Sequence, residues 1–258
     1  HKFVSDTFSV KFPGAETDYT HYPMTYDFDD FRGEENYTKQ FVSKLIVEGS
    51  GQCHSMPLLF LILAQEYNTE AYLAFAPSHS YIKFPDDNGN WHNLELTNGM
   101  LTSEAFIMES GYIKAEALIS KIFMDTINMR QTIAYTMVDL VKGYIRKYGY
   151  DKFVLEATNY AIEQNNSNVF AHMLKANYYT ALSMYVVKQM GYPKPEIVFE
   201  DEKARDLFIL RDESYNELER VGYEEIPKEV YASWLKSLEK EKMKQAQKSN
   251  TTNLRSSF

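Results

Sequence analysis

The most constraining feature of this sequence is a helical stretch that is apolar on nearly every side. One face carries Met56, Leu59, Phe60, Leu63 and Tyr67 at helical spacing, and Leu58, Leu61 and Ile62 cover the other sides. A helix that is apolar all round is buried, because a surface helix keeps one polar face. Pro57 falls in the first turn, where its missing N–H has little cost. We therefore predict a buried helix near 55–67.

The segments around this helix predict a small antiparallel sheet. Residues 80–84 alternate between apolar and polar side chains, as a half-buried strand does. The Asn-Gly pair within 85–89 predicts a turn that joins this strand to a returning one. The predicted elements are, in order, irregular or short-strand structure at 1–33, a short helix at 36–47, the buried helix, and strands at 71–76, 80–84 and 91–97.

From about Glu104 onward the sequence is helical in pattern. Glycine, asparagine and proline separate five stretches, at 133–147, 152–164, 168–190, 201–221 and 227–247. Around 157–179, small and aromatic residues resemble the pattern of tetratricopeptide repeats, which stack helix pairs with a period of about 34 residues. A plain array of helical hairpins explains the same pattern. We expect an α+β domain at 1–125 and a mostly helical, repeat-like region at 126–258.

Charge and hydropathy exclude two kinds of partner. The net charge is −9 and the chain has no basic run, so nucleic acid is excluded as a partner. The longest apolar run, Met56–Ala64, is shorter than the roughly 18 residues that span a bilayer. The chain begins at His1, so we expect an artificially shortened chain or a mature form without its signal peptide. An extracytoplasmic location is favoured over a cytoplasmic one.

Cys53, the only cysteine, stands between a glycine-rich turn and the predicted buried helix. A single cysteine forms no internal disulfide and leaves the redox compartment open. At a helix start, free N–H groups stabilise a thiolate, and the N–H of Cys53 itself can bind an oxyanion. Gln52 can donate to the same oxyanion or cap the turn. The alternative is a buried, inert cysteine, since unpaired cysteines are common in cores.

A thiol nucleophile needs a base, and the base needs an acid to orient it. His79 opens one strand of the predicted hairpin, and Glu95 lies in the other. If Phe84 pairs with Asn90 across a five-residue loop, His79 lies opposite Glu95, with Cβ atoms about 5 Å apart. A shift of one residue would place Leu96 opposite His79 instead.

Other side chains near this hairpin have simpler explanations. His92 points to the other strand face from Glu95, and His54 points away around the helix, so we expect both to be structural or exposed. Trp91 can cover the site or pack against a neighbour.

Two metal sites are unsupported by the sequence. A zinc site of Cys53, His54, His79 and His92 has no recognised ligand spacing. The acidic stretch at 27–30 lacks the spacing of a calcium-binding loop, so we expect a solvated acidic loop.

Three runs of the sequence, in order, resemble the transglutaminase-like superfamily, which has a papain-like fold. They are Gly-Gln-Cys-His-Ser-Met-Pro-Leu-Leu at 51–59, Pro-Ser-His-Ser-Tyr-Ile at 77–82 and Trp-His-Asn-Leu-Glu-Leu-Thr at 91–97. The superfamily shows Gly-x-Cys at a helix start, then a His at the head of a strand and an Asp near the end of the next strand. Cys53 and His79 match the first two positions, and Glu95 falls on the Asp position between Trp91 and Thr97.

This resemblance covers roughly 41–99, under a third of the chain. The sequence departs from the superfamily pattern in two ways: Glu95 is one methylene longer than Asp, and the interval from Cys53 to His79 is short. The superfamily also includes peptidases, amide-transferring enzymes, amidases and inactive binding members.

The resemblance implies an α+β, papain-like core, with the helix of Cys53 packed on the sheet of His79 and Glu95. It implies that Cys53 attacks an amide carbonyl of a peptide or protein substrate. His79 takes the thiol proton and returns one to the leaving amine, while Glu95 orients the ring. Water or an amine then releases the acyl group, and no metal or organic cofactor is needed.

Two other functions stay open. Inactive members of the superfamily suggest a non-catalytic peptide-binding or scaffolding protein with a relic triad. Some bacterial members couple such a domain to tetratricopeptide-like helices, which suggests a protein partner on the helical half. A helical-repeat adaptor predicts a concave, aromatic-lined groove in that half and a closed Cys53 site.

Overall fold

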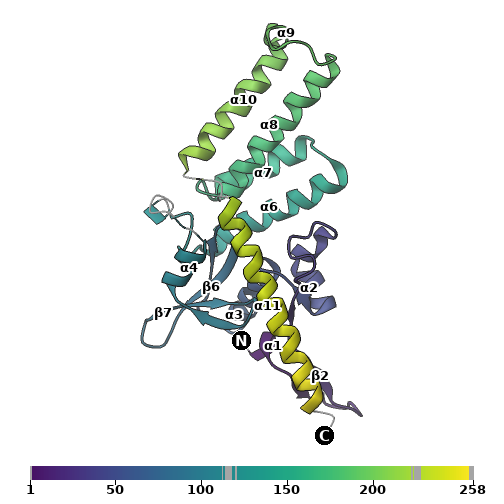
Figure 1. The fold of residues 1–258 in the computed structure, drawn as a ribbon, viewed down its shortest axis with the longest axis vertical. Coiled ribbons are helices and arrows are strands. Elements are labelled where there is room, and N and C mark those ends of the chain that lie inside the picture. The colour runs from purple at the N-terminus through teal and green to yellow at the C-terminus, as the bar shows by residue number, and fades with distance from the viewer. Residues whose placement is uncertain are drawn as a thin grey trace. The chain divides into compact units, whose positions relative to one another are not determined.

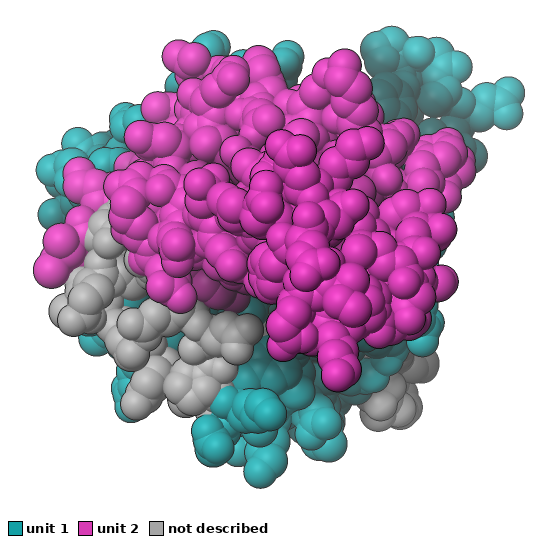
Figure 2. All heavy atoms as spheres, turned by 90° about the horizontal axis from the view of Figure 1, so that it is seen from above, with its two compact units in different colours: residues 1–113, 226–258 teal, residues 114–225 magenta. Residues whose placement is uncertain are grey.

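The structure is a computed structural model that describes residues 2–111, 113, 118–119, 121–221, 223 and 228–255. The chain divides into two compact units, one made of residues 1–113 and 226–258 and the other of residues 114–225 (Figure 2). The division predicted from the sequence lies at 125, with all later residues in the helical region. Helix α11, Lys228–Arg255, instead joins the first unit, where Gln245 Nε2 donates to the Thr97 carbonyl at 2.7 Å.

The predicted buried helix is α3, Ser55–Glu66, which packs against strands β5, Tyr72–Ala76, and β6, His79–Pro85 (Figure 1). Met56 and Leu59 are buried, as the apolar pattern predicts. The prediction of burial on all sides is wrong, because Ile62 is 53% exposed. The last turn of α3 leads into a turn at 67–70 whose residues are exposed.

An antiparallel sheet of four strands, in the order β5-β6-β7-β8, carries the predicted hairpin. Strand β7 is Trp91–Glu95, and β8, Met100–Thr102, was not predicted from the sequence. Phe84 pairs with His92, so the predicted Phe84–Asn90 register is wrong by two residues. The pairing ends at Pro85 and Trp91, so the loop still has five residues but lies one residue later in the chain. Within it the Asp86 N–H donates to the Asn90 carbonyl at 2.8 Å, and the Asp86 carboxylate accepts from the Asn90 N–H at 2.8 Å.

A tight turn fixes where β6 begins. Ala76 of β5 pairs with His79 of β6, so only Pro77 and Ser78 connect the two strands. Ser78 has a φ of 57°, a left-handed conformation that is uncommon for residues other than glycine. The turn therefore places His79 at the first position of β6.

The segment before α3 holds a second, parallel strand pair. Strands β3, Thr25–Tyr26, and β4, Ser50–Gly51, pair with Tyr26 beside Gly51. The single helix predicted at 36–47 is instead the 3-10 helix η1, Tyr37–Gln40, followed by α2, Val42–Glu48.

Gly51 lies where only glycine fits. A Cβ at this position would lie 2.6 Å from Ser55 Oγ and 2.9 Å from Leu45 Cδ1. The chain therefore passes close to the start of α3 just before it reaches Cys53.

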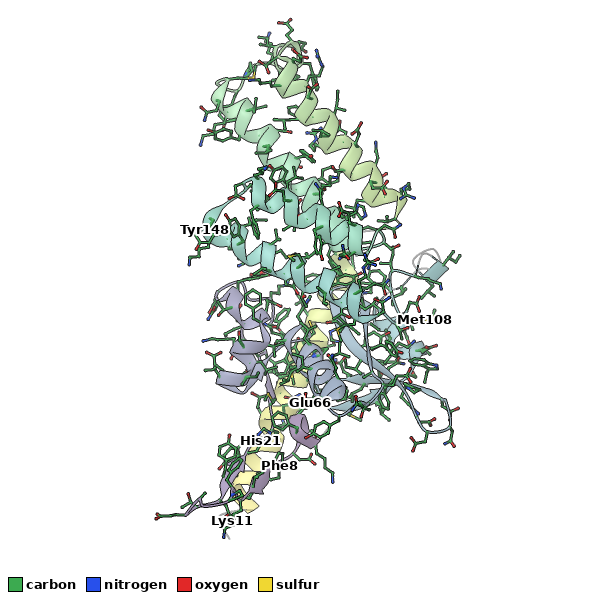
Figure 3. The ribbon with its side chains drawn as sticks, turned by 180° about the vertical axis from the view of Figure 1, so that it is seen from behind. Phe8, Lys11, His21, Glu66, Met108 and Tyr148 are labelled. Carbon is green, nitrogen blue, oxygen red and sulfur yellow. The ribbon has the colours of Figure 1, made fainter. Side chains whose placement is uncertain are left out.

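The lead-in at 1–33 contains short elements, as predicted. Phe8 and His21 lie opposite each other in an antiparallel pair, with ring centroids 4.6 Å apart (Figure 3). The remaining elements of the first unit are α1, Lys2–Ser5, β1, Phe8–Val10, β2, Tyr19–His21, and α4, Glu104–Gly111.

The elements described in the second unit are helices. They are α6, Met129–Tyr148, α7, Lys152–Gln164, α8, Val169–Gln189, α9, Pro195–Glu200, and α10, Glu202–Arg220. Asp151, Asn168 and Asp201 cap three of these helices through their side chains. Val138, Val154 and Leu174 belong to one core shared by α6, α7 and α8. A tetratricopeptide-like arrangement of these helices stays a prediction.

The chain is therefore α+β, with sheet and helices in the first unit. Among the helices of the described residues, none is long and apolar enough to cross a membrane.

Candidate active site

Cys53 lies in the first turn of helical hydrogen bonding. The Met56 N–H donates to the Gln52 carbonyl at 3.0 Å, so this bonding begins one residue before Cys53. Ser55 Oγ accepts the Gln52 N–H at 3.1 Å, which caps the turn. First-turn N–H groups have no partner within a helix, and they carry its positive dipole end. The Cys53 thiol is therefore placed where a negative charge is stabilised.

Ser80 ties the start of α3 to the sheet. Its hydroxyl is buried and donates to the Cys53 carbonyl. Since Ser80 follows His79 in β6, the same strand fixes both the backbone of Cys53 and the ring of His79.

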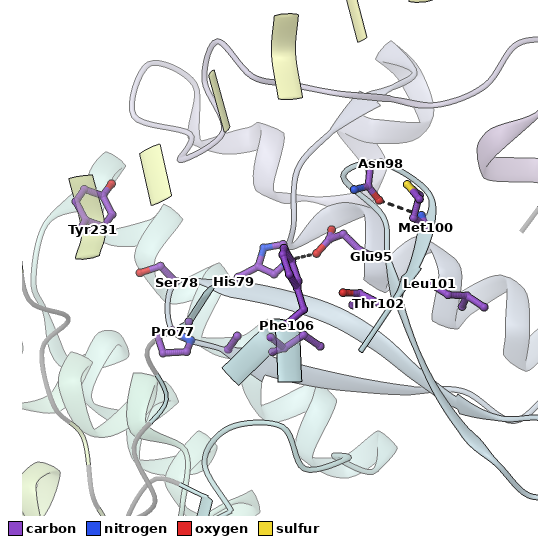
Figure 4. Close-up of a pocket in the computed structure, with 13 residues that line it drawn as sticks. Pro77, Ser78, His79, Glu95, Asn98, Met100, Leu101, Thr102, Phe106 and Tyr231 are labelled. Atoms are coloured by element: carbon purple, nitrogen blue, oxygen red, sulfur yellow. Dashed lines mark hydrogen bonds and ion pairs between the residues drawn. The ribbon is translucent and has the colours of Figure 1, made fainter. Parts of the chain in front are cut away.

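His79 contacts both other members of the predicted triad. Its Nε2 is hydrogen-bonded to Glu95 Oε2 (Figure 4). The Cys53 side chain lies close enough to the ring for each group to shift the pKa of the other. Because Nε2 is engaged with Glu95, Nδ1 is the nitrogen left for the sulfur. The structure thus brings Cys53, His79 and Glu95 together.

Glu95 reaches His79 diagonally. With Ile82 paired to Leu94, the residue directly opposite His79 would be Thr97, two positions beyond Glu95. A two-residue shift leaves every side chain on its own face of the sheet, so Glu95 and His79 stay on the same face. Diagonal neighbours are about 7–8 Å apart, within reach of long side chains. The extra methylene of Glu95, relative to aspartate, fits this diagonal position.

Thr97 holds the second oxygen of Glu95. Glu95 Oε1 accepts from the Thr97 N–H at 2.8 Å and from Thr97 Oγ1 at 2.7 Å. The two carboxylate oxygens therefore have different partners: Oε2 is hydrogen-bonded to His79, and Oε1 accepts from Thr97. This leaves the carboxylate little freedom to turn.

The charges of the site favour a thiolate–imidazolium pair. Burial raises the pKa of the Cys53 thiol, but the His79 hydrogen bond and the charges of His54 and His79 bring it below its ordinary value. Burial lowers the pKa of His79, yet Glu95 and Cys53 hold that pKa well above its usual range. Burial opposes charge on Glu95 as well, and His79 and Thr97 still lower the pKa of the Glu95 carboxyl.

A cavity of about 220 Å³ opens beside the imidazole (Figure 4). Its wall includes His79, Glu95 and the apolar side chains of Leu101, Phe106 and Tyr231. Cys53 is not part of this wall and is only 7% exposed. The cavity therefore touches the base and the acid of the site, while Cys53 does not line it.

Gln52 and Trp91 lie differently from the triad. Gln52 is fully buried, and its Oε1 accepts from Ser55 Oγ at 3.5 Å, so its observed contact is the capping one. Its Nε2 has no hydrogen-bond partner among the described residues. Trp91 packs against Tyr72, with ring centroids 5.8 Å apart, and does not line the cavity.

The side chains considered for metals have other contacts. His92 Nε2 lies 3.1 Å from Asp86 Oδ2, at the hairpin loop. Asp27 pairs with Lys39 at 2.7 Å, and Asp30 accepts backbone N–H groups, including that of Glu34 at 2.7 Å. Within the described ranges, no three His, Cys, Asp or Glu side chains lie close enough to hold a metal ion.

Sequence reasoning missed the groups that support the triad. Ser80 and Thr97 each stand within two residues of a triad member, so a search of neighbouring hydroxyls would have found them. His54 was assigned no role, although its charge lowers the Cys53 pKa.

Comparison with protein-family models, curated proteins and solved structures finds no match to this chain.

Proposed function

We propose that this protein is a cysteine-dependent amide or peptide hydrolase, or an acyl transferase, of the transglutaminase-like (papain-like) type. The observation that carries the proposal is the chain of contacts from Cys53 through His79 to Glu95. A nucleophile bonded to a base, and a base bonded to an orienting acid, form the arrangement that covalent acyl transfer requires.

The proposed reaction begins with the Cys53 thiolate. The sulfur attacks the carbonyl carbon of an amide, a C–S bond forms and the carbonyl electron pair moves to oxygen. His79 then gives its proton to the leaving nitrogen as the C–N bond breaks. Water or an amine, losing a proton to His79, releases the acyl group from sulfur. Glu95 holds the ring and balances its charge throughout.

The cavity suggests where the substrate lies. The acyl carbon must contact Cys53, whereas the leaving nitrogen must contact the His79 ring. Because the cavity includes His79 and excludes Cys53, it suits the leaving-group side of a peptide or protein substrate. Leu101 and Phe106 in its wall favour an apolar group there.

The burial of Cys53 favours a second candidate, a non-catalytic peptide-binding or scaffolding protein with a relic triad. Cys53 is only 7% exposed, so in this candidate a substrate carbonyl reaches its sulfur only if neighbouring groups move. This candidate predicts an inert thiol and peptide binding that does not depend on Cys53.

Alkylation of the folded protein by iodoacetamide separates the two candidates. A free thiol reacts with a pKa of about 8.5. In the catalytic proposal the pH profile of alkylation lies well below that value, and His79→Ala moves it back. His92→Ala is the matched control, since His92 contacts Asp86 at the hairpin loop. A wild-type profile of an ordinary thiol, unchanged by His79→Ala, contradicts the catalytic proposal.

An intact-mass screen with thiol-directed peptide probes then tests substrate recognition. We expect covalent adducts on the wild-type protein and none on Cys53→Ala. Adducts that form equally with probes of any sequence indicate reactivity without a peptide site.

A further inference from the structure

The buried hydroxyl of Tyr26, close to Cys53, has no function in the reaction proposed above. Tyr26 is 6% exposed, and its hydroxyl has no hydrogen bond of ordinary geometry with the described residues. A buried polar group without a partner is costly, which makes such a group a candidate for a role in catalysis.

The backbone holds Tyr26 at the entrance to α3. Tyr26 pairs with Gly51 in the parallel β3–β4 ladder, and the Asp27 N–H donates to the Gly51 carbonyl at 2.7 Å. This ladder ends two residues before Cys53. The position of the Tyr26 ring is therefore set by the strand that leads directly to the nucleophile.

The Tyr26 hydroxyl lies within reach of two groups of Cys53, the side-chain sulfur and the backbone N–H. In a tetrahedral intermediate, the oxyanion is bonded to the carbon that the sulfur has attacked. A site between the Cys53 N–H and the Tyr26 hydroxyl is where that oxygen can accept two hydrogen bonds. Catalytic hydrogen bonds are often poorly aligned without substrate and tighten in the transition state.

We propose that Tyr26 donates its hydroxyl proton in a hydrogen bond to the oxyanion, together with the backbone N–H of Cys53. This inference rests on the proposed acyl-transfer function. As the C–S bond forms, the carbonyl electron pair moves to oxygen, and the Tyr26 O–H bond stays intact while it donates. When the intermediate collapses, the pair returns to carbon and the C–N bond breaks.

The charges near Tyr26 keep it a donor. Burial, together with the charges of Cys53 and Glu95, holds the Tyr26 pKa well above its ordinary value. The hydroxyl therefore stays protonated over the range in which the thiolate–imidazolium pair exists. Gln52 is the rival donor, because its Nε2 is also buried without a hydrogen-bond partner among the described residues.

Two thiol reagents separate oxyanion stabilisation from thiolate formation. p-Nitrophenyl acetate acylates a thiolate through a tetrahedral intermediate, whereas iodoacetamide alkylates it by displacement without one. Both need the thiolate, so the ratio of acylation to alkylation rates cancels any change in the Cys53 pKa. Loss of one oxyanion donor lowers acyl transfer by about 10²–10³-fold. We expect Tyr26→Phe to lower the ratio by a factor of that order.

The control variants are Tyr22→Phe and Gln52→Met. Tyr22 is 71% exposed, so its change should leave the ratio at the wild-type value. A ratio unchanged in Tyr26→Phe, or lowered only in Gln52→Met, overturns the role of Tyr26 and leaves the proposed function standing. A wild-type thiol that neither reagent modifies faster than a free thiol overturns both. Circular dichroism confirms that Tyr26→Phe, which removes a single oxygen, keeps the fold.

Discussion

Glu95 orients His79 from a diagonal position in the β6–β7 hairpin, not from the position directly opposite. The paired residues Ile82 and Leu94 set this offset, and Glu95 Oε2 still bonds His79 Nε2 across it. Glutamate is therefore suited to this hairpin, because a shorter carboxylate on the same backbone lies further from the ring.

Glu95→Asp tests this geometry. We expect the shortened carboxylate to lose its hydrogen bond to the His79 ring. The pKa of His79 then falls toward its ordinary value of about 6.5. Glu95→Gln keeps the reach and removes the charge, and it should lower the His79 pKa as well. Titration of the His79 ring proton by nuclear magnetic resonance measures both shifts. Glu48→Gln, at the surface pair with Lys44, is the control. An unchanged titration in Glu95→Asp contradicts the diagonal argument.

The His79–Glu95 pair gives the fold a defined pH dependence. The folded pKa of Glu95 is lowered, so its contribution to stability is present above about pH 4.3 and is lost as pH falls through the folded pKa. The folded pKa of His79 is raised, so its contribution is complete below about pH 6.5 and is lost as pH rises through the folded pKa.

The stabilising effect of the pair is therefore greatest between about pH 4.3 and 6.5. Hydrogen bonds to charged groups contribute about 1.5–3 kcal/mol. We expect the free energy of unfolding of wild type to exceed that of Glu95→Gln by a similar amount near pH 5.5. Urea denaturation at several pH values measures this difference. A difference that is largest at pH 9 would falsify the assignment of a charged pair.

The hairpin could be predicted from sequence, but its register could not. Alternation and the Asn-Gly pair locate two strands and a turn. The register depends on where the loop begins, and the contacts of Asp86 with Asn90 accompany a five-residue loop that lies one residue later than a Phe84–Asn90 pairing would place it. The pattern of apolar residues gives no information about such local hydrogen bonds. The prediction that Glu95 and His79 lie on the same face of the sheet nevertheless holds, because a register shift of two residues leaves each side chain on its own face.

The candidate site was predictable only where its residues belong to ordered patterns. Cys53 and His79 stand at the heads of a helix and a strand, and both are visible in sequence. Tyr26 lies on a two-residue strand within irregular sequence, and only its pairing with Gly51 brings it to the site. The place of α11 in the first unit depends on contacts between distant residues, such as Gln245 with Thr97, which no local pattern encodes.

Gly51→Ala should destabilise the first unit. The new Cβ would lie 2.6 Å from Ser55 Oγ and 2.9 Å from Leu45 Cδ1, and Leu45 is fully buried. Overpacking of this kind costs about 1–3 kcal/mol. Thermal and urea denaturation measure the loss, and the alkylation rate of Cys53 reports whether the turn before α3 has moved.

The double variant Gly51→Ala/Ser55→Ala provides the control. Removing Ser55 Oγ relieves the closest of the two contacts, so the double variant should lose less stability than the sum of the single variants. Residues in direct contact commonly show such coupling. Strict additivity of the two changes contradicts a steric clash at Ser55.

Thr97→Val should loosen Glu95 without altering the sheet. Valine keeps the shape of threonine and the backbone N–H at 2.8 Å from Glu95 Oε1, but it removes the hydroxyl at 2.7 Å. Because that hydroxyl stabilises the carboxylate, we expect the Glu95 pKa to rise and the His79 pKa to fall in Thr97→Val. The alkylation profile of Cys53 should then move to higher pH. Thr97→Ser retains the hydroxyl and should keep the wild-type profile. If Thr97→Val and Thr97→Ser behave alike, Thr97 acts through its backbone alone and its hydroxyl does not position Glu95.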